Sequence, residues 1–136
     1  MNVFVVGSGK LAEELLSSLH GNHIKSVRRW SDISSCLQDD IVVVHAGSGR
    51  ELDAVYAYCS KNKKPMIELA TSTNYDSFYP NFPVIVCPNT NVLMLKFMAM
   101  VQRAGEGFKK YERTILESHQ STKTSEAGTA RSLARS

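Results

Sequence analysis

Residues 3–12 read Val3-Phe4-Val5-Val6-Gly7-Ser8-Gly9-Lys10-Leu11-Ala12, and this stretch decides the fold. The run at residues 3–6 is continuously apolar and rich in β-branched side chains, as in a strand that is buried on both faces. Leucines then recur at helical spacing, at positions 11, 15, 16 and 19. The sequence therefore predicts a buried strand, a glycine turn and a helix in direct succession.

Residues 7–12 have the form G-x-G-x-x-A, a fingerprint of dinucleotide-binding turns. Gly7 permits the tight turn, Gly9 lets the backbone approach a pyrophosphate, and Ala12 lets the helix pack closely on the strand. The free N–H groups and positive end of the helix then favour phosphates. An ordinary β–α corner is the alternative. The residues predicted to bind the cofactor here are Gly7, Ser8, Gly9, Lys10 and Leu11.

Composition and charge limit the classes of function. The chain has 136 residues, of which 43% are hydrophobic, enough for a buried core, and its net charge of +3 does not favour nucleic acid. Its three cysteines lack metal-binding spacing and are interpreted as buried, reduced thiols, so we expect no metal site. Neither a signal peptide nor a membrane-spanning stretch is recognisable. We expect a soluble, cytoplasmic protein with no membrane partner.

Strand-like and helix-like segments alternate beyond the first helix, which we expect to end at Gly21-Asn22. Apolar runs predict strands at 23–27, 41–44, 65–69 and 84–86. Helices are predicted at 32–37, capped by Ser31-Asp32, and at 50–61, where Leu52, Val55, Tyr56 and Cys59 share one face. This order predicts an α/β protein with a Rossmann-type, doubly wound parallel sheet over residues 1–90.

The second predicted strand ends in Arg28-Arg29-Trp30, where an NAD-binding domain usually offers a carboxylate to the ribose 2′-hydroxyl. Two guanidinium groups at this place suit a 2′-phosphate, and the tryptophan ring could stack on adenine. Solvated arginines and an edge-packed tryptophan are the alternative. Asp32 is the rival acidic candidate. We therefore predict NADP(H) as the cofactor, held by Arg28 and Arg29, with NAD(H) as the alternative.

Two further strands end in small or hydroxyl-bearing residues, at His45-Ala46-Gly47-Ser48-Gly49 and at Ala70-Thr71-Ser72-Thr73. Open α/β sheets bind ligands at this edge. His45 is interpreted as a loop histidine with satisfied hydrogen bonds, and a catalytic role is the less favoured reading.

The last third of the chain differs from the alternating pattern. Residues 92–105 form a helix that is apolar nearly all round, so we expect it to be buried or to pack against another subunit. Residues 111–116 alternate and predict a strand that enters a second α+β lobe. We place this second lobe at residues 91–136.

Near the end, Glu117, His119 and Lys123 are followed by Gly128-Thr129-Ala130. With the glycine turn upstream, this spacing resembles the dihydrodipicolinate reductases, NAD(P)H enzymes of the diaminopimelate route to lysine. Their motif has the form E-x-H-H-x-x-K and then D-A-P-S-G-T-A. Two other segments resemble the family's G-T-T and A-x-N-F segments and would contact the cofactor: Ala70, Thr71 and Ser72, and Cys87, Pro88, Asn89 and Thr90.

The resemblance implies hydride transfer to a cyclic, unsaturated dicarboxylate. His119 would be the general acid, and Lys123 would stabilise negative charge and share the proton transfer. Gly128 and Thr129 would bind a substrate carboxylate, with Gln120 beside them. The family also implies a homo-oligomer.

Several positions depart from the family pattern. Gln120 replaces the second histidine, the D-A-P-S segment is one residue shorter, and the chain stops at Ser136, without the family's C-terminal part. Two alternatives therefore stay open: a related NAD(P)-dependent amino-acid or keto-acid dehydrogenase, and a dinucleotide-binding module without catalysis.

Overall fold

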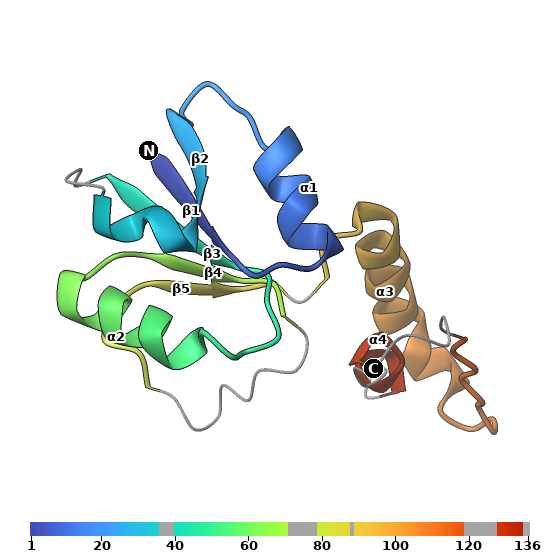
Figure 1. The fold of residues 1–136 in the computed structure, drawn as a ribbon. Coiled ribbons are helices and arrows are strands. Elements are labelled where there is room, and N and C mark those ends of the chain that lie inside the picture. The colour runs from blue at the N-terminus through green and yellow to red at the C-terminus, as the bar shows by residue number, and fades with distance from the viewer. Residues whose placement is uncertain (36–39, 71–78, 88, 119–127, 135–136) are drawn as a thin grey trace. The chain divides into compact units, whose positions relative to one another are not determined.

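A computed structural model describes residues 1–35, 40–70, 79–87, 89–118 and 128–134. The chain divides into two compact units: unit 1, Met1–Pro88, and unit 2, Asn89–Ser136. Figure 1 labels the elements of each unit. In the part of the chain described, no helix combines the length and apolar character needed to cross a membrane.

Unit 1 is built on five parallel strands in the order β2-β1-β3-β4-β5. The strands are β1 (Asn2–Val6), β2 (Ser26–Arg29), β3 (Ile41–His45), β4 (Met66–Glu68) and β5 (Val84–Val86). The chain runs from β1 outward to β2, crosses back past β1 to β3, and continues to β5. The predicted doubly wound parallel sheet is confirmed, and 2-1-3-4-5 is one of the two common orders of such sheets.

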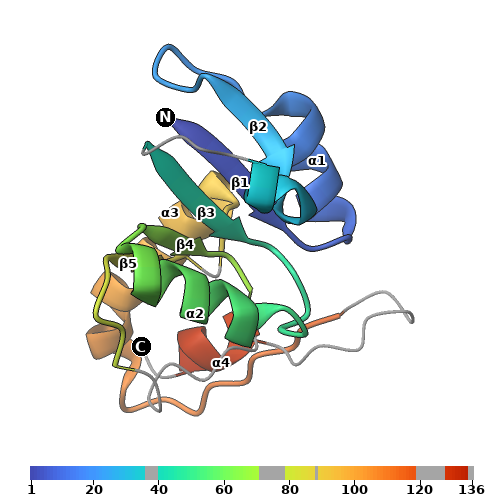
Figure 2. The ribbon, with the colours of Figure 1, turned by 60° about the vertical axis from the view of Figure 1, so that its left-hand side comes forward.

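Helices cover both faces of this sheet (Figure 2). Alternate side chains of β1 point to opposite faces, and each set packs against the helices on its own side. The covering elements are α1 (Lys10–Ser18), the 3₁₀ helix η1 (Trp30–Ser35) and α2 (Leu52–Asn62). Val3 and Val5 pack with α1, whereas Phe4 and Val6 pack with η1 and α2. All of β1 is buried, and each such apolar side chain contributes about 1.5–3 kcal/mol.

The early element boundaries differ from the prediction. Helix α1 ends at its cap residue Leu19, before the predicted glycine at position 21. Strand β2 begins three residues later than predicted, because its extent is set by pairing with β1, where Val3 faces Val27. The 3₁₀ helix begins at Trp30, so Asp32 lies in its first turn instead of capping it.

Helix α2 has the predicted buried face of Leu52, Val55, Tyr56 and Cys59. Its C-terminal cap residue, Lys63, is exposed and adopts the left-handed conformation with φ 53° and ψ 38°.

Unit 2 contains α3 (Val92–Ala104), the 3₁₀ helix η3 (Gly105–Phe108) and α4 (Gly128–Ala134). Asn91 caps α3 by accepting the Met94 N–H at 3.1 Å. No residue of α3 is buried within the part of the chain described, so burial, the first of the two expected alternatives, is not seen there, and packing against another subunit stays a prediction. Residues 111–116 form no strand, because alternation alone supplies no neighbouring strand for the backbone hydrogen bonds.

Candidate functional site at the carboxyl edge of the sheet

The strand order of unit 1 reverses between β1 and β3. The chain leaves β1 toward β2 on one side and returns to β3 on the other. Ligands of open α/β sheets bind in the crevice outside the carboxyl ends of the strands at such a point. Two loops form its rim: residues 7–9 after β1, and residues 46–51 after β3.

Gly7 is required by the fold itself. Its φ is +121°, and a Cβ added to it would lie 2.8 Å from the carbonyl oxygen of Ala46 and 2.9 Å from Cα of Gly47. Both are backbone atoms, which cannot turn away as a side chain can. The two rim loops are therefore in direct contact, and only glycine fits at position 7.

Gly9 is not required by the fold. It lies at the start of α1 with φ −83° and ψ 175°, a conformation open to any residue. A Cβ added to Gly9 would meet no atom within 4 Å. No side chain among the described residues caps α1 through its N-cap position, so the N-terminal end of the helix is open. Ser8, Gly9 and Lys10 are exposed and Leu11 is half-buried.

The two predicted phosphate-binding arginines lie at the end of β2 and differ in their contacts. Arg29 Nη2 donates to both carboxylate oxygens of Glu13 in α1, at 2.9 and 2.7 Å. Arg28 is exposed and forms no ion pair with any residue that the structure describes. The exposed Arg29–Glu13 pair is worth at most about 1 kcal/mol, so an anionic ligand can replace the carboxylate.

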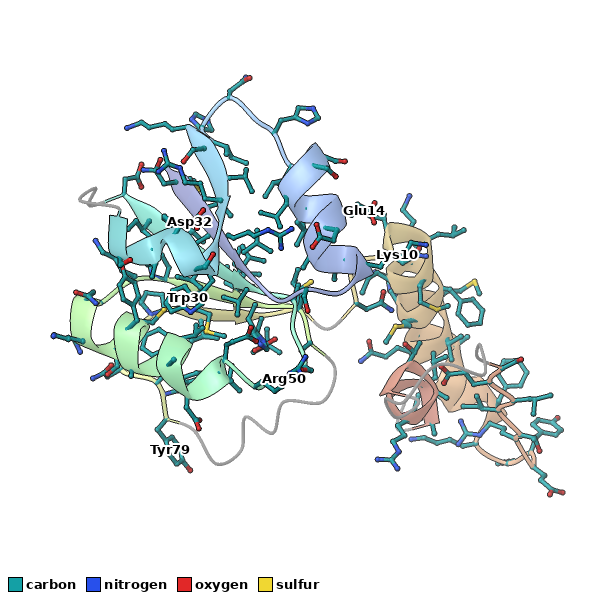
Figure 3. All side chains as sticks on the ribbon, in the orientation of Figure 1. Lys10, Glu14, Trp30, Asp32, Arg50 and Tyr79 are labelled. Carbon is teal, nitrogen blue, oxygen red and sulfur yellow. The ribbon has the colours of Figure 1, made fainter. Side chains whose placement is uncertain are left out.

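Trp30 packs as the alternative reading of the sequence expects. Its ring meets Tyr58 edge-on, with 5.3 Å between ring centroids, and it lies half-buried against the core beside Ile33. Figure 3 shows Trp30 and Asp32 on η1. Asp32 accepts a hydrogen bond from Ser31 Oγ at 2.9 Å.

A buried acid–imidazole pair lies where β3 and β4 end. His45 and Glu68 face each other in the strand register, and both side chains are completely buried. His45 Nδ1 lies 2.7 and 2.8 Å from the two carboxylate oxygens of Glu68. Glu68 Oε1 also accepts the Ala70 N–H at 2.7 Å. Burial, and then the charge of Glu68, raise the pKa of nearby Tyr56.

The second ring nitrogen of His45 has no partner within the described part of the chain. Nε2 is buried and has no hydrogen-bond partner among the described residues. A Cβ added to Gly47 would lie 3.1 Å from Nε2, 3.3 Å from Cα of Gly7 and 3.5 Å from Oε2 of Glu51. Nε2 therefore lies beneath the place where the two rim loops meet. The interpretation of His45 as fully hydrogen-bonded is wrong for this nitrogen.

Glu68 was not among the predicted site residues. The signal lay in two matching positions: both strands end in a polar residue that directly follows a buried apolar run, at His45 and at Glu68. Their pairing depends on the register of β3 with β4, which the separate runs do not specify.

The other predicted cofactor residues are only partly described. Thr71, Ser72 and Pro88 lie outside the described residues. The Cys87 N–H donates to the Glu68 carbonyl oxygen at 2.8 Å and so extends the β5 pairing. In unit 2, Asn89 Oδ1 accepts the Asn91 N–H at 3.0 Å, and Thr90 is exposed.

The predicted catalytic and substrate residues His119, Lys123 and Gln120 also lie outside the described residues. Helix α4 begins at Gly128, and its Ala130 N–H donates to Glu117 Oε2 at 3.0 Å. An amide at the start of α4 thus holds a carboxylate of the chain itself. Thr129 lines a neighbouring hollow of about 490 Å³ together with Phe97, Leu133 and other largely apolar residues.

No family model, no curated protein and no solved structure matches the chain. Across the residues described, no three side chains of the His, Cys, Asp or Glu type come together as metal ligands would.

Proposed function

We propose that unit 1 binds NADP(H) across the β1–β3 edge, as the cofactor-binding part of an NAD(P)H-dependent reductase that resembles the dihydrodipicolinate reductases. The bound cofactor would supply a hydride for reduction of an anionic substrate. The residues of unit 1 would hold its phosphates and fix its position on the sheet.

The open position at Gly9 carries this proposal. The conformation of Gly9 suits any residue and no atom of the fold occupies the space of its missing side chain. A ligand that must approach the backbone explains a glycine at this place, because a pyrophosphate at the start of a helix needs close access to the N–H groups. Gly7 shows the contrasting case, a glycine that packing explains.

The charge at the end of β2 supports the phosphorylated cofactor. Arg28 is exposed and not ion-paired among the described residues, and Arg29 is held toward α1 by an exposed carboxylate. Two guanidinium groups beside the adenosine half would bind a 2′-phosphate in preference to a bare hydroxyl.

The substrate side of the proposal rests on the motif at residues 117–130. His119 would protonate the reduced product, Lys123 would offset its negative charge, and the first turn of α4 would bind a carboxylate. The amide of Ala130, which binds the carboxylate of Glu117 at 3.0 Å, supports the last of these roles.

A second candidate ligand follows from the strand order. Some sheets of order 2-1-3-4-5 bind flavin mononucleotide at the same β1–β3 point. The glycine fingerprint favours the dinucleotide, and both ligands belong in the same experiment.

The test is a calorimetric titration of the full chain with NADPH, NADH and flavin mononucleotide. We expect NADPH to bind most tightly. Gly9→Ala should weaken NADPH binding at least about tenfold while urea unfolding shows no loss of stability. Gly107→Ala is the matched control, because a Cβ at Gly107 also meets nothing within 4 Å. Failure of NADPH and NADH to bind, or equal binding by the Gly9→Ala variant, would refute the proposal.

The reductase step has its own test, which is NADPH oxidation with cyclic unsaturated dicarboxylates as substrates. Full turnover by a His119→Ala variant would refute the assignment of His119 as proton donor without refuting the proposal that unit 1 binds NADP(H).

A further inference from the structure

The buried His45–Glu68 pair needs an explanation beyond packing. Burying polar groups is costly unless every one of them is hydrogen-bonded. The Glu68 carboxylate meets this condition through His45 Nδ1 and the Ala70 N–H. Nε2 of His45 does not meet it within the described residues, although the side chain is completely buried. Two apolar side chains would fill the same space without this cost.

Glu68 determines which ring nitrogen of His45 carries the proton. A carboxylate only accepts hydrogen bonds, so the nitrogen 2.7 Å from it, Nδ1, donates. In the neutral ring Nε2 is then a hydrogen-bond acceptor. The pair therefore holds one acceptor in a fixed direction, and no described residue supplies a donor to it.

That acceptor lies at the ligand edge. Gly47 lies between it and the contact of the two rim loops, since a Cβ on Gly47 would lie 3.1 Å from Nε2 and 3.3 Å from Cα of Gly7. Glycine has no side chain, so it covers a buried atom with its backbone alone. The next residues are also small, and Gly49 has φ +90° with open space on its Cβ side.

The position of His45 Nε2 favours one half of a dinucleotide as its hydrogen-bond partner. If the cofactor crosses the β1–β3 point with its adenosine half at the β2 arginines, its nicotinamide-riboside half lies over β3 and β4. That half carries hydrogen-bond donors, the carboxamide N–H and the ribose hydroxyls. We propose that His45 Nε2 accepts a hydrogen bond from this half as the Gly47 backbone shifts, with Glu68 as the positioning residue. This inference rests on the proposed function.

The test uses three ligands of increasing length: 2′,5′-ADP, 2′-phospho-ADP-ribose and NADPH. They are titrated against the wild-type chain and a His45→Leu/Glu68→Leu double variant, in which neither polar side chain stays buried without the other. His23→Leu, at an exposed position, is the matched control. We expect the double variant to bind 2′,5′-ADP as the wild type does and NADPH about tenfold more weakly, the loss of one hydrogen bond to a buried group.

The middle ligand identifies the donor. A loss already present with 2′-phospho-ADP-ribose assigns a ribose hydroxyl, and a loss that appears only with NADPH assigns the carboxamide. An equal loss on all three ligands, or on none, would overturn the inference. The proposed function fails separately, if none of the three binds the wild type.

A measurement on the wild-type chain keeps the test independent of variant folding. The ¹⁵N resonance of His45 Nε2 and the amide of Gly47 should shift with NADPH and stay in place with 2′,5′-ADP. Identical spectra with the two ligands would contradict the inference.

Discussion

Removing His45 alone from the His45–Glu68 pair should cost more stability than removing both residues. Both side chains have no exposed surface, and their hydrogen-bonded atoms are 2.7 Å apart. In His45→Leu a buried carboxylate keeps only the Ala70 N–H, and we expect a loss of about 3–5 kcal/mol of unfolding free energy. In Glu68→Leu a buried neutral imidazole loses its acceptor, and we expect a loss of about 1–3 kcal/mol.

The double variant His45→Leu/Glu68→Leu removes both polar side chains and leaves the Ala70 N–H without its Glu68 acceptor. Its loss should be about 1–3 kcal/mol, less than the sum of the two single losses. The cycle therefore predicts a coupling energy of more than about 1 kcal/mol between the two side chains.

Urea unfolding followed by the fluorescence of Trp30, the sole tryptophan, measures all four proteins. The exposed Glu13–Arg29 pair provides the control: Glu13 and Arg29 are each replaced by Leu, singly and together. Its coupling should not exceed about 1 kcal/mol. If the losses of unfolding free energy in the two single variants simply add in the double variant, the two side chains do not stabilise each other as their distance indicates.

Three other perturbations test separate features. Gly7→Ala should lose several times the ~1 kcal/mol typical of a point variant, since its Cβ would meet the Ala46 carbonyl oxygen at 2.8 Å; thermal unfolding measures this. Lys63→Gly should gain about 1 kcal/mol by relieving a left-handed residue at φ 53°, and an unchanged urea midpoint would contradict it. Burial raises the pKa of the Cys59 thiol from 9.0 to about 11, so the folded state keeps a proton that the unfolded state loses. Unfolding free energy should therefore fall more steeply with rising pH across that range in the wild type than in Cys59→Ala.

The parts of the fold that could be predicted are those with local causes. A strand buried on both faces needs a continuous apolar run, and a packed helix needs one apolar face, so β1, β3, β5 and α2 lie within one or two residues of prediction. Residues 111–116 have the alternation of a strand without a neighbouring strand. A strand is a property of two segments, and the pattern of one cannot establish it.

The candidate site divides in the same way. Gly7 could be recognised because backbone geometry limits which residue fits a turn, and Gly9 because it belongs to the same G-x-G-x-x-A pattern. The Arg29–Glu13 contact joins residues sixteen positions apart, and depends on how α1 lies along β2. The His45–Glu68 contact depends on the register of two strands. Neither contact can be inferred from the sequence of one segment, so the role of each residue stays open until its neighbour in the fold is known.

The place of β1 at the centre of the sheet has a consequence for synthesis. It is synthesised before both of its neighbours, β2 and β3, and its pairing with β3 joins Asn2 to Ile41 and Val6 to His45. A nascent chain that stops short of these residues carries an apolar strand with an open hydrogen-bonding edge, a surface that favours association with other chains. We therefore expect unit 1 to fold late on the ribosome and to need protection by a chaperone until β3 emerges.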